Sequence, residues 1–158
     1  NGQLYILTNR HVVYHEVENP HSLSYEVELE NGIQLPAVLD FYSRQHDLAL
    51  VMVPGLAGWG APAPLRLCRD LVVGETVYAL GSPIGLDHSF TSGVISALRG
   101  NLVQTDATVH SGSSGGPLFD DRGRVCGVIT TSHREKDFSF AQCAESVLEM
   151  LDERVAVK

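Results

Sequence analysis

The segment Gly112-Ser113-Ser114-Gly115-Gly116-Pro117 is the most informative part of this chain. It places Ser114 between small residues, so the backbone of a substrate could approach its hydroxyl. A serine hydroxyl is a poor nucleophile at neutral pH and needs a positioned base and donors for the oxyanion that forms. Consecutive backbone N–H groups in a glycine-rich turn can supply such donors, which predicts an oxyanion hole formed by Gly112, Ser113 and Ser114. Alone, this run would be an ordinary flexible loop, and Ser111 and Ser113 are the alternative nucleophiles.

Two blocks upstream of this serine offer a base and a group to orient it. His11 follows an apolar run within Leu7-Thr8-Asn9-Arg10-His11-Val12-Val13, where a rigid strand can hold its ring still. Asp47 opens the run Asp47-Leu48-Ala49-Leu50-Val51, where a partly buried carboxylate could fix an imidazole tautomer. Alone, these residues would be a surface histidine and a strand-start cap. Together with the serine they predict a triad in the order His, Asp, Ser.

That order separates two classes of hydrolase. The G-x-S-x-G pattern also occurs at the nucleophile of α/β-hydrolases, whose acid and histidine follow the serine. Only His133 follows Ser114 here, and no alternation of strands and helices precedes it, so this class is disfavoured. Asp40 is a competing carboxylate, but it lies outside the apolar block of Asp47.

Composition indicates one soluble globular unit. The 158 residues can bury one substantial core or two small packed halves. The net charge of −8, with 11 Lys and Arg residues, disfavours nucleic acid as a partner. No apolar stretch approaches the roughly 18 residues of a membrane span. The three cysteines allow at most one internal disulfide, and the spacing of Cys and His predicts no metal site, so no cofactor is expected.

Short β-rich runs separated by turn signals predict an all-β barrel or sandwich. The expected strands are Leu4 to Leu7, Ser24 to Leu29, Ile33 to Phe41, Leu48 to Val53, Thr76 to Leu80, Phe90 to Ala97 and Arg124 to Thr131. Asn31-Gly32 predicts a hairpin turn after the first alternating run. The segment from Pro54 to Pro64, rich in Gly and Pro, is interpreted as a connector between two β halves.

After Phe140, apolar residues at helical spacing predict an amphipathic helix at the end of the chain. Its acidic residues are interpreted as a solvated face; they are Glu145, Glu149, Asp152 and Glu153. Five histidines are expected at the surface, although His46 adjoins Asp47 and could tune it; they are His15, His21, His46, His88 and His133.

Five blocks together resemble the trypsin-like peptidase domain of the HtrA (DegP-like) family. They are Leu7–Val13, Asp47–Val51, Gly74–Leu86, Thr91–Ala97, and Gln104–Ala107 with Gly112–Leu118. The resemblance implies an all-β, chymotrypsin-like fold of two six-stranded β-barrels with the active site between them and a C-terminal helix. Within a single domain 1–158, we expect a first barrel at 1–56, a connector at 57–71, a second barrel at 72–140 and the helix at 141–154.

The resemblance also implies a serine endopeptidase that works through an acyl-enzyme. Ser114 would be the nucleophile, His11 the general base and then acid, and Asp47 the residue that holds the His11 tautomer. By analogy with trypsin-like enzymes, the base of the substrate pocket lies six residues before the serine. The expected pocket residues are Thr108, Ile129 and Thr130. The absence of a carboxylate at the base predicts a preference for small or medium apolar side chains.

One departure from the family pattern concerns the oxyanion loop, where Val109-His110-Ser111 stands in place of the usual Asn-Pro pair. The rival hypothesis is therefore a protease-fold binding protein or chaperone with a latent or inactive site. The partners implied by the resemblance are polypeptide substrates, including unfolded proteins, and further copies of the chain in a homo-oligomer. The resemblance also favours an extracytoplasmic location in the periplasm or cell envelope.

Overall fold

The computed structural model describes residues 4–14, 24–55, 64–82, 89–133 and 138–157. Its elements are β1 (Leu4–Thr8), α1 (Arg10–Val13), β2 (Tyr25–Glu28), β3 (Gln34–Tyr42), β4 (Ala49–Val53), the 3₁₀ turn η2 (Cys68–Asp70), β5 (Thr76–Gly81), β6 (Ser89–Arg99), β7 (Leu102–Thr105), β8 (Pro117–Phe119), β9 (Val125–His133), β10 (Phe138–Cys143) and α2 (Ala144–Ala156). The surface positions expected for His15, His21 and His88 lie outside the described residues, as does the side chain of His133.

The first half is an antiparallel sheet with the strand order β1-β4-β3-β2. The predicted hairpin joins β2 to β3, and Gly32 takes a φ of 77° in its turn, a conformation that glycine adopts without strain. Alternate residues such as Val51 and Val53 point into a small apolar core with Ala37 and Val13. Within the described residues this half has four strands, where the resemblance implied a six-stranded barrel.

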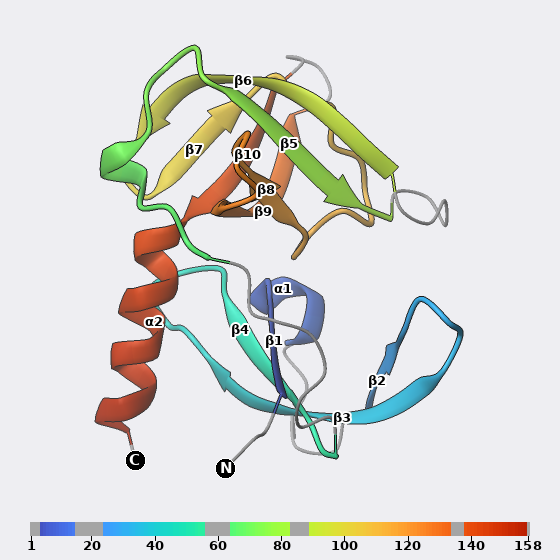
Figure 1. The fold of residues 1–158 in the computed structure, drawn as a ribbon. Coiled ribbons are helices and arrows are strands. Elements are labelled where there is room, and N and C mark those ends of the chain that lie inside the picture. Colours follow the sequence, from blue (N-terminus) through green and yellow to red (C-terminus); the bar gives the residue numbers. More distant parts are fainter. Residues whose placement is uncertain (1–3, 15–23, 56–63, 83–88, 134–137, 158) are drawn as a thin grey trace.

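The second half is a closed barrel with the order β10-β7-β6-β5-β8-β9, which lies beside the first sheet (Figure 1). Its interior is filled by fully buried side chains from several strands, among them Val77, Ile95, Val103 and Leu118. The expected six strands are present here, and each of them, even the short β8, pairs with a neighbour on both sides. Closure leaves no unpaired sheet edge among these strands.

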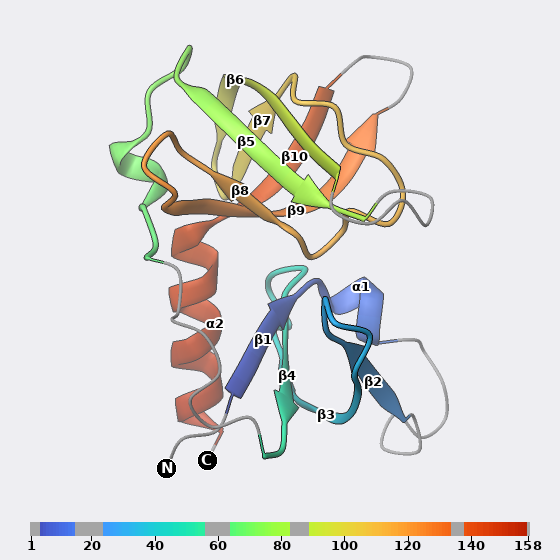
Figure 2. The same cartoon turned by 45° about the vertical axis from the view of Figure 1, so that its right-hand side comes forward.

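The closing helix α2 begins at Ala144, because β10 continues to Cys143 beyond the expected start of the helix. In two views it leaves the second barrel and runs along the first sheet (Figure 1, Figure 2). Val147 and Met150 on its apolar face pack with Leu50 of the first half and Val128 of the second. The helix therefore joins the two halves through one shared apolar cluster. Among the described residues, no helix has the length and apolar character needed to cross a membrane.

The acidic face of the helix was expected to be only a solvated face, but three of its four members contact other segments, although Glu149 remains exposed. Glu145 accepts backbone hydrogen bonds from the connector, Glu149 contacts His46, and Glu153 accepts from the turn before β4. Only Asp152 is exposed without such a contact among the described residues. His46, expected at the surface, is buried with 6% of its area exposed.

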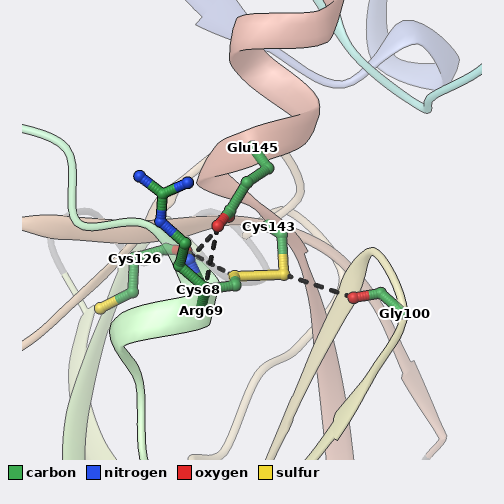
Figure 3. The surroundings of a disulfide bond; sticks show 6 residues. All are labelled: Cys68, Arg69, Gly100, Cys126, Cys143 and Glu145. Carbon is green, nitrogen blue, oxygen red and sulfur yellow. Dashed lines mark hydrogen bonds between the residues drawn. A yellow bond between two sulfur atoms is a disulfide. The ribbon is translucent and has the colours of Figure 1, made fainter.

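A disulfide bond joins Cys68 in η2 to Cys143 at the end of β10 (Figure 3). Beside it, the Glu145 carboxylate accepts the backbone N–H groups of Cys68 at 2.6 Å and Arg69 at 3.1 Å. The third cysteine, Cys126, is buried, and burial raises the pKa of its thiol to about 12. A thiol that stays protonated is a poor partner for disulfide exchange, so the pairing of Cys68 with Cys143 is secure.

Replacing both bridged cysteines, Cys68→Ser with Cys143→Ser, should lower the free energy of unfolding by about 2–5 kcal/mol, because the bond closes a long loop. Urea denaturation of the variant and of the reduced native protein should give the same loss. Alkylation after unfolding without reductant should modify Cys126 alone. Three reactive thiols in that experiment would show that the disulfide does not form.

The Glu145 contact should make stability depend on pH. Burial raises the pKa of Glu145, but the N–H groups of Cys68 and Arg69 outweigh it and hold the pKa below its ordinary value. The stabilisation is therefore complete above the ordinary glutamate range and is lost as the pH falls through the lowered folded-state pKa. Glu145→Gln should cost about 1–2 kcal/mol at pH 7 and less near pH 3. Urea denaturation at both pH values checks this, with Asp152→Asn as the control, and a difference that grows in acid would contradict it.

Candidate functional site

The end of β1 and the short helix α1 lie at the end of the first half that is nearer to the second barrel (Figure 2), and α1 contains His11. β1 ends at Thr8, Asn9 breaks the strand, and the single turn α1 then carries the histidine. Asn9 is fully buried, and its side-chain amide donates to the backbone carbonyl of Asp47 at 2.9 Å. This contact ties the segment of the histidine to the turn between β3 and β4.

The carboxylate of Asp47 receives three hydrogen bonds. The His11 ring contacts it through Nδ1 at 2.6 Å from Oδ2, and the backbone N–H of His11 donates to Oδ1 at 3.0 Å. The hydroxyl of Thr130 in β9 donates to Oδ2 at 2.6 Å. Because a carboxylate accepts, Nδ1 of His11 carries the proton and Nε2 is left as the acceptor of the ring.

Ser114 lies beside the same strand, β9. Gly115 N–H donates to the carbonyl of Ile129 at 2.9 Å, and Ile129 N–H donates back to Gly116 at 2.8 Å. This pairing places the Ser114 hydroxyl 3.4 Å from the Thr130 carbonyl, which is its hydrogen-bond partner among the described residues. Thr130 therefore contacts the acid through its side chain and the serine through its backbone.

A direct contact between the two halves presses the serine turn against β1. Gly115 has a φ of +87°, and a Cβ at this position would lie 2.3 Å from Thr8 Oγ1. Only a glycine gives both the backbone conformation and the space. The turn that carries Ser114 is thus held against Thr8, which precedes His11 by three residues in the sequence.

The backbone of the loop before Ser114 forms a tight turn. Ser113 N–H donates to the carbonyl of His110 at 3.1 Å, and Gly116 N–H donates to Ser113 at 3.0 Å. Within the described part of the chain, the N–H groups of Gly112 and Ser114 have no protein acceptor. The Ser113 side chain is buried, and a Cβ at Gly81 would lie 2.5 Å from its hydroxyl. Two of the three predicted oxyanion donors therefore have no acceptor among the described residues, and the Ser113 side chain is enclosed.

Of the three expected pocket residues, Thr108 lines a hollow among the described residues. This cavity of about 330 Å³ is lined by Thr108 and by apolar residues that include Leu80, Phe90 and Val109. Ile129 is 1% exposed and belongs to the barrel core. The Thr130 hydroxyl faces Asp47. Ile129 and Thr130, which were expected in the pocket, are not among the residues that line this hollow.

Two residues at the site were not assigned these contacts from the sequence. Asn9 is a plain polar residue within the histidine block, and Thr130 was expected in the pocket. Their contacts with Asp47 span 38 and 83 residues of sequence. The position of Asn9 at the strand end is a local signal of chain reversal, but nothing local indicates which segment either residue meets.

The comparisons with known proteins place the chain in a family. The family model of the trypsin-like peptidase domain matches residues 1–128. A probable periplasmic serine endoprotease, DegP-like, of Ectopseudomonas mendocina is 39% identical over 94% of this chain and 32% of its own length. Protease Do-like 1, chloroplastic, of Arabidopsis thaliana is 34% identical over 81% of this chain and 30% of its own length. The chain thus spans about a third of the length of these curated relatives.

Solved structures agree on the fold. The serine endoprotease from Yersinia pestis superposes with a TM-score of 0.81 at 30% identity, over 96% of this chain and 54% of that one. The HtrA-type protease AlgW, solved with a decapeptide, gives 0.81 at 25% identity over 99% and 50%. The all-β, chymotrypsin-like fold with a C-terminal helix is therefore confirmed. The chain belongs to the trypsin-like peptidase family, in its HtrA (DegP-like) group.

Gly115→Ala should destabilise the protein more than Gly123→Ala. Both glycines have positive φ, so alanine at either position introduces about 1–2 kcal/mol of backbone strain. Nothing lies within 4 Å of a Cβ at Gly123, whereas the Cβ at Gly115 meets Thr8. Thermal unfolding of the two variants measures the difference, and Thr8→Ala should recover part of it. Equal losses in both variants would contradict the contact between the halves.

Proposed function

We propose that this chain is a serine endopeptidase domain that hydrolyses peptide bonds through an acyl-enzyme, with Ser114 as nucleophile, His11 as base and Asp47 as its orienter. The observation that carries the proposal is the 2.6 Å contact between His11 Nδ1 and Asp47 Oδ2, because it leaves Nε2 free to take a proton. The relatives that are named serine endoproteases support the same reaction.

In the proposed reaction, the Ser114 hydroxyl gives its proton to His11 Nε2 as Oγ attacks the carbonyl carbon of the substrate. The tetrahedral intermediate collapses, the C–N bond breaks, and the imidazolium protonates the leaving amine. A water molecule then gives a proton to His11 and attacks the acyl ester. The ester C–O bond breaks, Ser114 regains its proton from His11, and the free acid leaves.

The bond that the hydroxyl makes at rest is weak. The separation of 3.4 Å between Ser114 Oγ and the Thr130 carbonyl is long for a hydrogen bond between oxygens. Rotation of the side chain about Cα–Cβ therefore gives up little when the hydroxyl turns toward His11. Catalytic hydrogen bonds in unliganded enzymes are often long and tighten in the complex with substrate.

The proposed oxyanion hole consists of the N–H groups of Gly112 and Ser114. This is narrower than the expectation from the sequence, because Ser113 N–H is already donated to His110. Each donor to the developing oxyanion is typically worth about 3–4 kcal/mol. Two unpaired N–H groups are sufficient for this role, while the third keeps the turn in shape.

The hollow that contains Thr108 supports a preference for small or medium apolar side chains. No carboxylate is among its described lining residues, so a substrate Lys or Arg would find no counter-charge there. Leu80, Phe90 and Val109 supply apolar surface instead. The proposed substrates are therefore polypeptides, including unfolded ones, cleaved after residues of this kind.

An extracytoplasmic location is part of the proposal. Several relatives are named as periplasmic, and a structural disulfide such as Cys68–Cys143 persists best in an oxidising compartment. Assembly into a homo-oligomer follows from the family resemblance alone.

The second candidate is a binding protein or chaperone with a latent site. One observation favours it, namely that the Ser114 hydroxyl bonds to Thr130 and, within the described residues, not to His11. The two candidates differ in whether the serine reacts.

A fluorophosphonate probe should label the native protein at Ser114, since labelling needs the activated hydroxyl and the oxyanion donors. Ser114→Ala and His11→Ala should abolish labelling and casein cleavage, and Asp47→Asn should slow both by about 10³–10⁴-fold. Ser111→Ala is the control and should still react. A native protein that is neither labelled nor cleaves casein would leave the binding candidate in place.

A further inference from the structure

The turn that carries Asp47 is held in shape by Ser43. Ser43 N–H donates to the carbonyl of Leu48 at 2.9 Å and closes the turn. The Ser43 hydroxyl accepts the backbone N–H groups of Gln45 at 3.1 Å and His46 at 3.0 Å. A turn with this many internal bonds moves as one body, so a contact at any of its residues also places Asp47.

Helix α2 contacts this turn at two points. Glu153 accepts the Ser43 hydroxyl at 2.7 Å and the Arg44 N–H at 3.2 Å. One helical turn earlier, Glu149 Oε2 lies 2.6 Å from His46 Nε2. Residues four apart share a face of a helix, so both carboxylates approach the turn from the same side.

The contact between His46 and Glu149 joins a fixed group to a solvated one. The His46 side chain is 5% exposed, whereas that of Glu149 is 51% exposed. The buried ring has no freedom to leave the turn, and the carboxylate pays little desolvation to meet it. The contact therefore restrains the distance between α2 and His46, which precedes Asp47.

The helix itself is anchored in both halves. Near its start, Glu145 and the disulfide at Cys143 attach it to the connector. Near its end, Arg154 pairs with Asp40 in β3, and its guanidinium lies over the ring of Tyr5 in β1. An element fixed at both ends can act as a reference for the turn between them.

We propose that His46 and Glu149 are positioning residues that hold Asp47 in register with His11 through helix α2. This inference rests on the proposed function, in which Asp47 orients the imidazole. Small displacements of catalytic groups by distant changes cost large factors in rate. Loss of the contact lets the turn drift from α2 and weakens the hold of Asp47 on the His11 ring.

Glu149→Ala tests this directly, with Asp152→Ala as the matched control that removes one charge from the same helix. We expect kcat to fall about tenfold while KM changes by less than about twofold, since substrate binding surfaces are untouched. Glu149→Gln keeps an oxygen that accepts from His46 and should recover most of the rate. Asp152→Ala should behave as the native protein does. Activities are compared well below the melting temperature and normalised to folded protein.

A second pair of variants shows whether the effect passes through Asp47. In an Asp47→Asn background, Glu149→Ala should lower the rate of fluorophosphonate labelling by less than about twofold, because coupled residues are not additive. His46→Leu removes the donor from the other side of the contact and should match Glu149→Ala. A contact that served stability alone would lower the melting temperature without this pattern.

The outcomes separate this inference from the proposed function. If Ser114→Ala retains full hydrolysis, the proposed function fails. If Ser114→Ala is inactive but Glu149→Ala and His46→Leu keep the native kcat, the function stands and the positioning role is overturned. Full additivity with Asp47→Asn would also overturn it.

Discussion

The hydrogen bonding of the Asp47 carboxylate is the constraint on which the rest of the site depends. A partly buried carboxylate is costly unless donors surround it. Here the donors come from His11 in the first half and from Thr130 in the second. The carboxylate is therefore fully satisfied only when the two halves are docked, and that docking also sets Ser114 beside Thr130.

The packing of the two halves in turn depends on residues that have no catalytic group. Gly115 permits the serine turn to touch Thr8, because any larger residue would collide there. On the opposite side, Val147 and Met150 of α2 fill a cluster shared with both halves. Apolar burial of this kind is worth about 25 cal/mol per Å² and does not require exact partners. The contact between Gly115 and Thr8 fixes the relative position of the two halves, and the apolar cluster of α2 stabilises their packing.

Local patterns in the sequence predicted β5, β6 and β9, whereas the six-stranded second barrel and the pairing of His11 with Asp47 were implied by the family resemblance; the patterns missed β7, β8 and β10. β8 has only three residues, too few for a pattern. β10 alternates in the reverse sense from the usual one: small Ser139, Ala141 and Cys143 face the barrel interior, while Phe138 and Phe140 are less buried. Tertiary packing reversed a pattern that hydrophobicity alone would assign to the other face.

The acidic face of α2 shows the same limit from the functional side. The spacing of Glu145, Glu149 and Glu153 identified a shared face of the helix, yet a charge pattern says nothing about what packs against it. His46 and Glu149 are 103 residues apart in sequence, so only the fold reveals their contact. Each of these carboxylates accepts a hydrogen bond: Glu145 from the connector, and Glu149 and Glu153 from the turn that carries Asp47. A face that looks like plain solvated surface in the sequence is thus the means by which the last element of the chain restrains the turn of Asp47.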